Sequence, residues 1–209
     1  PGSMWLPTVD AQNEAGARDA VYPDGVHAPM WVRIQSELRD QGLEPQPVAV
    51  VDDHGEPLPA LLAVLALVAR HNLVLATGHL SRDEIFAVVD AAVDAGVRDI
   101  VITHPEFPAQ DLSETDQAWL ADRGALLERC FTTPHTGKCS WERVYAGIRA
   151  TGAERNLLST DLGQPANPPV EDGLALFADR LLGGGFTDDE IRTMTATNSR
   201  RLALAAVTA

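Results

Sequence analysis

The sequence is poor in basic residues, and lysine occurs only once, at position 138. The chain has 209 residues, of which 30 are aspartate or glutamate and 16 are lysine or arginine, so its formal net charge is −14. A surface this negative repels the phosphate backbone of nucleic acids, and the arginines are scattered rather than clustered. We therefore expect no nucleic-acid partner. The length is sufficient for one sizeable domain with its own core.

Cysteine and long apolar runs are also scarce. The two cysteines, Cys130 and Cys139, lack the paired CxxC spacing of a zinc finger, and we expect reduced thiols rather than a disulfide framework. The longest apolar stretch, residues 58–69, is shorter than the ~18 residues of a membrane span and predicts a buried helix instead. Because no signal peptide is visible, we expect a cytoplasmic protein without a membrane partner. Residues 1–3 are typical of a vector remnant that precedes a start at Met4.

Several motifs of well-known enzyme classes are missing as well. The sequence has no GxSxG elbow, no Walker loop and no GxGxxG that follows a strand. These absences argue against a serine hydrolase of the elbow type, a P-loop nucleotide hydrolase and a dinucleotide-binding enzyme. The GGG at 183–185 follows a predicted helix, and we interpret it as the end of that helix and a loop.

The sequence does contain a repeated unit of strand and helix. Predicted strands start at residues 73, 99, 126 and 155, at intervals of 26, 27 and 29 residues. The strands are continuous apolar runs, which is typical of strands buried on both faces of a parallel sheet. The pattern predicts a parallel α/β protein built from βα units. The predicted strands are 73–77, 99–103, 126–131 and 155–160, and the helices after them are 81–96, 113–123, 140–150 and 171–182.

The remaining segments complete a single domain over residues 4–209, without a visible interdomain linker. Its irregular part is 10–57, which contains a long loop over 10–29 and a strand with a turn or hairpin arm over 47–59. The helix at 81–96 has a strong start signal, because Ser81 and Glu84 form a capping box. The other expected elements are a strand over 4–9 (MWLPTV), helices over 30–41 and 58–71, and a capped helix from Thr187 onward.

Three polar residues, His79, His104 and Asp161, each follow a predicted strand. In (β/α)₈ barrels, active-site residues project from the carboxyl ends of the strands. Two imidazoles and a carboxylate suit a divalent transition metal, Zn²⁺ or alternatively Mn²⁺ or Fe²⁺, and leave a position open for water. Each residue also has a structural explanation, because strand-end histidines often bond a loop and Asp161 could cap the turn of STDLGQ. Additional site candidates are Glu128, His135 and Lys138.

The strand-end motifs resemble those of the amidohydrolase superfamily, a group of metal-dependent hydrolases with a TIM-barrel fold. TGH at 77–79, THP at 103–105 and STDLGQ at 159–164 carry the resemblance, and the segment 190–205 is similar to the C-terminal helices of that superfamily. The likeness covers residues 73–209 well and the first 72 residues loosely.

The resemblance implies a role for each of the three residues. His79 and His104 would bind metal from the fifth and sixth barrel strands, and Asp161 on the eighth strand would bind metal and move a proton. The implied activity is the hydrolysis of an amide, ester or lactone bond in a small-molecule substrate by metal-activated water.

The chain departs from the superfamily at its N-terminal side. It contains no HxH pair and no lysine before position 138, and MWLPTV would be only about the fourth barrel strand. We therefore expect an incomplete TIM-type parallel (β/α) barrel with about five to six βα units and the first strands missing. An open doubly wound α/β sheet is the alternative fold.

The missing strands lead to two further expectations. A dimer mate, as in a homo-oligomer, or a complementing N-terminal chain would cover the exposed sheet edge; a misplaced start is another explanation. The second functional hypothesis is a non-catalytic, barrel-derived subunit or binding domain that has lost the metal centre.

Overall fold

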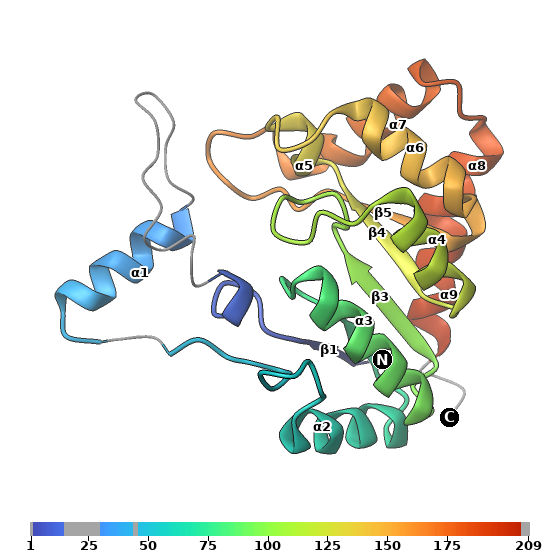
Figure 1. Ribbon diagram of the computed structural model, residues 1–209. Coiled ribbons are helices and arrows are strands. Elements are labelled where there is room, and N and C mark those ends of the chain that lie inside the picture. Colours follow the sequence, from blue (N-terminus) through green and yellow to red (C-terminus); the bar gives the residue numbers. More distant parts are fainter. Residues whose placement is uncertain (1, 15–29, 44–45, 206–209) are drawn as a thin grey trace.

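A five-stranded, all-parallel sheet forms the centre of the protein (Figure 1). The structure is a computed structural model, and it describes residues 2–14, 30–43 and 46–205. The order of the strands in the sheet follows their order in the chain. The strands are β1 (Ser3–Trp5), β2 (Val74–Ala76), β3 (Asp99–Thr103), β4 (Leu126–Cys130) and β5 (Asn156–Ser159). The predicted parallel α/β architecture is therefore confirmed.

Strand β1 begins and ends earlier than the predicted strand at 4–9. Ser3 lies opposite Val74 of β2, and the paired segment ends at Trp5. Leu6 still donates its N–H to the Ala76 carbonyl at 3.0 Å. The next residue is Pro7, which has no N–H for a further ladder bond, and the chain leaves the sheet there.

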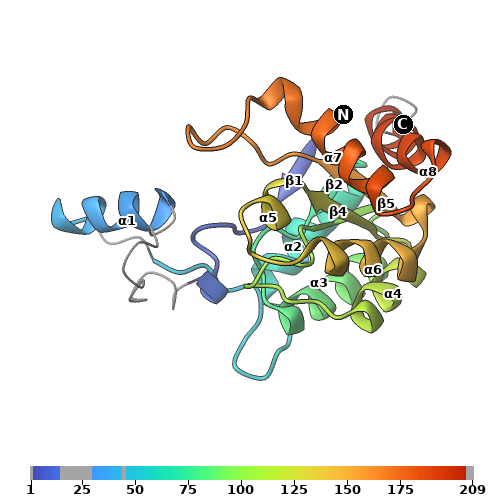
Figure 2. The ribbon, with the colours of Figure 1, turned by 90° about the horizontal axis from the view of Figure 1, so that it is seen from above.

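Four helices cover one face of the sheet, as Figure 2 shows from above. The first three pack their apolar sides on the strands in a core that includes Leu65, Val88, Ile102, Leu120 and Leu127. The fourth contributes Val144 and Ile148 to the core around β5. The predicted capping box of Ser81 and Glu84 starts the second of these helices, and an equivalent box starts the third. The helices are α2 (Pro59–Arg70), α3 (Arg82–Asp94), α4 (Glu114–Asp122) and α6 (Trp141–Thr151).

The C-terminal segments pack around β5, the last strand. A second core joins Leu158 of β5 to Phe177, Leu181 and Met194 of these segments. Leu202 lies on the opposite face of the sheet, against Ala76, Val101 and Leu126. The segments are η3 (Val170–Asp172), α7 (Gly173–Gly183), α8 (Asp188–Arg192), the π-helical η4 (Thr193–Thr197) and α9 (Asn198–Ala205).

The sheet is open at both edges in the part of the chain that the structure describes. There, β1 and β5 each pair with one neighbour and not with each other, so no closed barrel is formed. The side chain of Trp5 on the edge strand is 48 % exposed. The same described ranges contain no helix long and apolar enough to cross a membrane.

The irregular N-terminal region contains helix α1 (Met30–Asp40), as predicted. Gln35 ties it to the segment after β1 through bonds from Nε2 to the Val9 carbonyl and the Asp10 carboxylate. The segment predicted as a strand with a turn or hairpin arm contains two isolated bridges, a parallel one of Val48 with Ala11 and an antiparallel one of Val51 with Pro57, and the second closes the predicted turn. Most of the loop expected over 10–29 lies outside the described residues.

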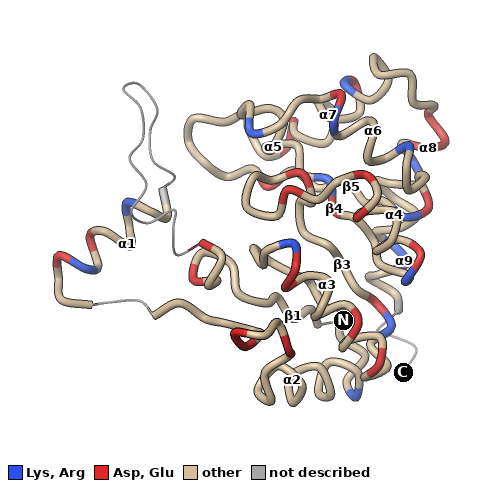
Figure 3. Tube along the Cα trace, in the orientation of Figure 1, with Lys and Arg blue, Asp and Glu red and all other residues tan. Residues whose placement is uncertain are grey.

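Charged residues of both signs are interspersed along the described trace (Figure 3). Acidic side chains start several helices, where Asp83, Glu84 and Glu190 lie at the positive end of the helix dipole. Cys130 and Cys139 are both free thiols, as expected.

Candidate functional site

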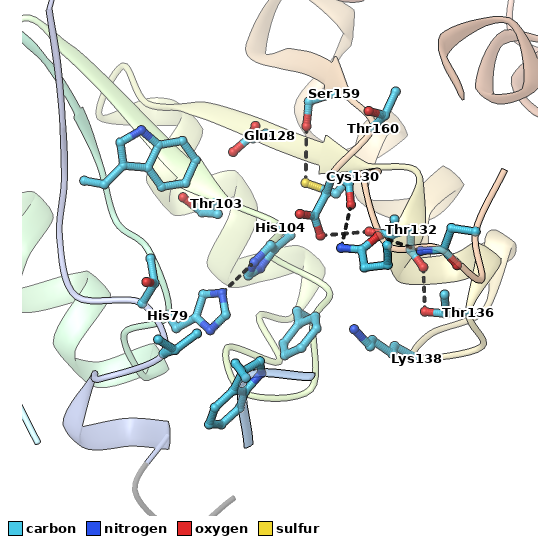
Figure 4. Close-up of a pocket in the computed structure, with 18 of the residues that line it drawn as sticks. His79, Thr103, His104, Glu128, Cys130, Thr132, Thr136, Lys138, Ser159 and Thr160 are labelled. Atoms are coloured by element: carbon cyan, nitrogen blue, oxygen red, sulfur yellow. Dashed lines mark hydrogen bonds between the residues drawn. The ribbon is translucent and has the colours of Figure 1, made fainter. Parts of the chain in front are cut away.

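A cavity of about 1010 Å³ lies at the carboxyl ends of the strands (Figure 4). Segments that follow all five strands contribute to its walls, because parallel strands present their carboxyl ends at one edge of the sheet. Five of the six predicted site residues line it, namely His79, His104, Glu128, Lys138 and Asp161. The sixth, His135, is exposed, is not part of the cavity wall, and stacks on Phe131 with ring centres 4.7 Å apart.

The position of His79 depends on a close backbone approach. Gly78 has φ of 61°, and a Cβ atom there would lie 2.5 Å from the Pro7 carbonyl oxygen and 2.6 Å from that of Leu6. Only glycine accommodates both the left-handed conformation and this contact. The His79 N–H then donates to the Pro7 carbonyl at 3.0 Å, so the segment after β1 fixes the loop that carries His79.

His104 has an unusual backbone conformation, with φ of 28°. Positive φ is rare in residues other than glycine, and such strain persists only where the surroundings hold it. Two bonds between neighbouring strands supply that support: Thr103 N–H donates to Thr77 Oγ1 at 3.1 Å, and Gly78 N–H donates to Thr103 Oγ1 at 3.2 Å. These bonds fix the loop that carries His79 relative to the loop that carries His104.

The two imidazoles meet at their Nε2 atoms, which are 3.2 Å apart. On the far side of His79, Nδ1 is 2.8 Å from Oε1 of Glu14, a side chain that is almost completely buried. A carboxylate accepts the Nδ1 proton, and in the neutral ring this leaves the lone pair on Nε2, directed toward His104. Glu14 thereby fixes both the ring orientation and the tautomer of His79.

His104 is buried and uncharged at neutral pH. Burial is the main cause and the neighbouring His79 the second, and together they lower the pKa of His104 to about 3. Its Nδ1 has no hydrogen-bond partner among the described residues, and Oε1 of the nearby Gln110 is also buried and unpaired. The amide of Gln110 donates to the Gly78 carbonyl at 3.2 Å, which ties this residue to the His79 loop.

Asp161, which follows β5, also lines the cavity. Its φ is 52°, and Oδ2 accepts a hydrogen bond of 2.9 Å from the Thr132 hydroxyl. Within residues 2–14, 30–43 and 46–205, no group of three His, Cys, Asp or Glu side chains is close enough to hold one metal ion. The structure therefore brings the two histidines together and places Asp161 at the same end of the sheet, without joining all three in one cluster.

Glu128 and Cys130 project from β4 into the cavity. Burial raises the pKa of Glu128, and its Oε2 has no partner in the described part of the chain. Burial also raises the pKa of the Cys130 thiol well above its ordinary value, and Sγ lies 3.3 Å from Ser159 Oγ. A thiol held in its protonated form is a poor nucleophile, so Cys130 is not a candidate for covalent catalysis.

Sequence reasoning missed Glu14, which belongs to the segment interpreted as a loop. No local motif marks it, since its partner His79 is 65 positions away. It also missed the ion pair of Glu106 and Arg129, both of which are completely buried. A signal for this pair was present, because an arginine in the middle of an apolar strand requires a buried partner.

Fold and site together define a parallel α/β protein with a braced histidine pair at the carboxyl end of its sheet. The chain belongs to a family of unknown function, DUF6282, whose model matches residues 2–128. The matched range includes Glu14, His79 and His104. No curated protein and no solved structure matches the chain.

Proposed function

We propose that the protein is a metal-dependent hydrolase of the amidohydrolase type, in which His79 and His104 hold a divalent transition metal. The observation that carries this proposal is the approach of the two Nε2 atoms to 3.2 Å. Two nitrogens that are each about 2.0–2.1 Å from a tetrahedral zinc ion lie about 3.3 Å apart, so the pair has the separation of two zinc ligands.

The surroundings of the pair also fit a metal. Neutral imidazoles bind metals, and the low pKa of His104 keeps that ring neutral at physiological pH. The bond from His79 to Glu14 has the form of the carboxylate–histidine–metal arrangement that orients ligands in known sites. Zn²⁺ is the preferred ion, with Mn²⁺ and Fe²⁺ as alternatives for a site of nitrogen and carboxylate donors.

The residues of the chain have distinct roles in the proposed reaction. When bound, the ion supplies an acidified water and polarises the carbonyl of an amide, ester or lactone. Asp161 would accept a proton from the water in this reaction, and the Thr132 hydroxyl, which donates to Oδ2, holds its carboxylate in place. The apolar walls formed by Trp5 and Phe107 orient the small-molecule substrate and reduce the access of bulk water.

The strand order supports an incomplete barrel over a doubly wound sheet. In doubly wound folds the strand order reverses at a switch point, and helices cover both faces. Here every crossover leads to the next strand in the same direction, and the crossover helices α2, α3, α4 and α6 lie on one face. The opposite face is contacted by Leu202 of the C-terminal helix α9, which is not part of a crossover. This is the arrangement of consecutive units of a (β/α) barrel.

The test compares thermal unfolding of wild type, His104→Ala and His135→Ala, each with Zn²⁺ and with a chelator. A ligand that binds only the native state stabilises it by about 2.7 kcal/mol at a concentration of 100 Kd. We expect Zn²⁺ to raise the melting temperature of wild type and of His135→Ala, since His135 lies outside the cavity. His104→Ala should lose this shift. The absence of a zinc-induced shift in wild type would overturn the metal site.

A second candidate function is a non-catalytic binding domain or subunit. It is favoured by one observation, the lack of a three-donor cluster among the described residues. Hydrolysis of a chromogenic ester by the zinc-loaded protein distinguishes the two. Turnover that disappears with Asp161→Asn supports the hydrolase, whereas zinc binding without turnover of esters, amides or lactones supports the binding domain.

A further inference from the structure

We infer that the cavity takes a substrate that carries a carboxylate, and that Lys138 is the residue that pairs with it. The inference deepens the proposed function, on which it rests for the location of the scissile bond at the histidine pair. It names a substrate class and a specificity-determining residue.

The backbone of Lys138 is held by the end of a short helix. After α5 (Thr132–His135), Gly137 takes φ of 74°, and the Lys138 N–H donates to the Thr133 carbonyl at 3.0 Å. A glycine in the left-handed conformation followed by such a bond is a common helix terminus. The side chain of Lys138 therefore starts from a fixed point on the wall and extends into the cavity (Figure 4).

One aromatic ring connects the ammonium group to the histidine pair. Nζ of Lys138 lies 4.4 Å from the centre of the Phe107 ring. The same ring packs against His104 and His79, with centres 4.8 and 5.6 Å apart. A small molecule that spans this ring can contact the histidines at one end and Lys138 at the other.

Lys138 has no ion-pair partner among the residues that the structure describes. The ion pairs found in that part of the chain are formed by arginines and by His79. Burial lowers the pKa of Lys138, while the more distant charges of Asp161 and Glu14 raise it. Partial burial of a cation without a contacting anion costs free energy, and an anionic group of a ligand would offset that cost. In a chain with a net charge of −14, this ammonium group is a local positive charge that attracts an anionic group.

A carboxylate fits better than a phosphate. Phosphate sites use several backbone N–H groups or a set of cations. Near Lys138, the Thr136 and Gly137 N–H groups already donate to the Thr132 and Pro134 carbonyls. The Thr136 hydroxyl likewise donates to the Thr132 carbonyl, at 2.7 Å. The Lys138 ammonium group by itself matches a single negative charge, as a carboxylate carries. The rest of the cavity includes Trp5 and Trp31, so an aromatic or other apolar acyl group suits it.

The test uses calorimetric titration of the metal-free protein with N-benzoylglycine and with its uncharged amide. Metal-free protein is needed because a carboxylate could otherwise bind a metal directly. We expect the acid to bind about tenfold more tightly than the amide, which corresponds to about 1.4 kcal/mol. Lys138→Met should abolish this preference without changing the affinity for the amide, and Lys138→Arg should retain most of it. Inorganic phosphate should not compete.

The matched control is Arg98→Met, which removes one positive charge from an exposed position outside the cavity. The inference would be overturned if wild type bound the acid and the amide with equal affinity, or if neither probe bound at millimolar concentration. It would also be overturned if Lys138→Met and Arg98→Met lost the preference for the acid to the same extent. Failure of the proposed hydrolase function is recognised separately. In that case the preference for the acid depends on Lys138, but the zinc-loaded protein shows neither a melting shift nor turnover.

Discussion

At the scale of single residues, Glu14 is the side chain on which the orientation of His79 depends. It comes from a distant segment, is nearly fully buried, and contacts Nδ1 at 2.8 Å. A second residue-scale interaction, between Arg82 and Asp116, connects the starts of two neighbouring helices at 2.6 Å. Both pairs lead to measurable consequences.

The first residue-scale prediction is that Glu14→Gln weakens zinc binding by about 10–100-fold, the usual effect of losing a carboxylate behind a metal-bound histidine. The amide cannot offer the charge that stabilises the Nδ1 proton. Competition with a chromophoric chelator measures the affinity. Glu142→Gln, an exposed change on α6, is the control and should bind zinc like wild type. Equal affinities of both variants would show that Glu14 has no part in metal binding.

The second residue-scale prediction concerns acid stability. The Arg82 guanidinium, with help from the Ser113 cap, lowers the pKa of Asp116 to about 2 from its ordinary value of 3.8. A depressed pKa stabilises the folded state above pH 4, and this contribution disappears as the pH falls from about 4 to about 2. Urea unfolding should show wild type more stable than Arg82→Gln at pH 6. The difference between the two free energies of unfolding should become smaller toward pH 2. A difference that does not change with pH would contradict the role of Arg82 in lowering the pKa of Asp116.

At the scale of elements, a buried polar network joins the loop after His104 to α4, β4 and β5. Arg129 pairs with Glu106, donates to Gln117 and Asn156 at 2.7 Å each, and is fully buried. Glu106 is two residues from His104, so the network anchors the strained loop. Because the charges are buried, every member needs its partners.

The corresponding prediction is that Gly147→Ala in α6 destabilises the protein by about 1–3 kcal/mol, the usual cost of overpacking. A Cβ atom there would lie 2.5 Å from Gln117 Oε1 and 2.8 Å from Arg129 Nη1. Helix propensity alone favours alanine by about 1 kcal/mol. Urea unfolding decides between the two effects. The control is Gly183→Ala in α7, where an added Cβ atom would meet none of the described residues within 4 Å beyond its own helix, and it should be neutral or stabilising.

At the scale of the whole molecule, the edge strand β1 exposes apolar side chains. Met4 is 38 % exposed and Trp5 is 48 % exposed, and β1 pairs on one side only within the described ranges. Exposed edge strands favour pairing with another chain. We predict that the protein associates with a second copy at micromolar concentration. Light scattering should show a dimer for wild type and more monomer for Met4→Lys, whereas a monomeric wild type would contradict the prediction.

Much of the architecture was predictable from the sequence, and particular residues show why. Ser81 and Glu84 lie within one turn, so their capping box depends on local geometry. Strand β3 has the predicted bounds because its apolar run is bounded by polar residues. The prediction of a strand over 4–9 was wrong after Trp5, because Pro7 prevents further pairing.

By itself, the sequence determined the alternation of strands and helices, the parallel sheet, and the location of His79 and His104 at the same edge. These follow from local periodicity and from the rule that parallel strands end together. The tertiary structure alone decided that Glu14 supports His79, that His135 stacks on Phe131 outside the cavity, and that Phe107 contacts both Lys138 and the histidine pair. Those contacts join residues that no local pattern relates, because the packing of distant segments, rather than the spacing along the chain, selects them.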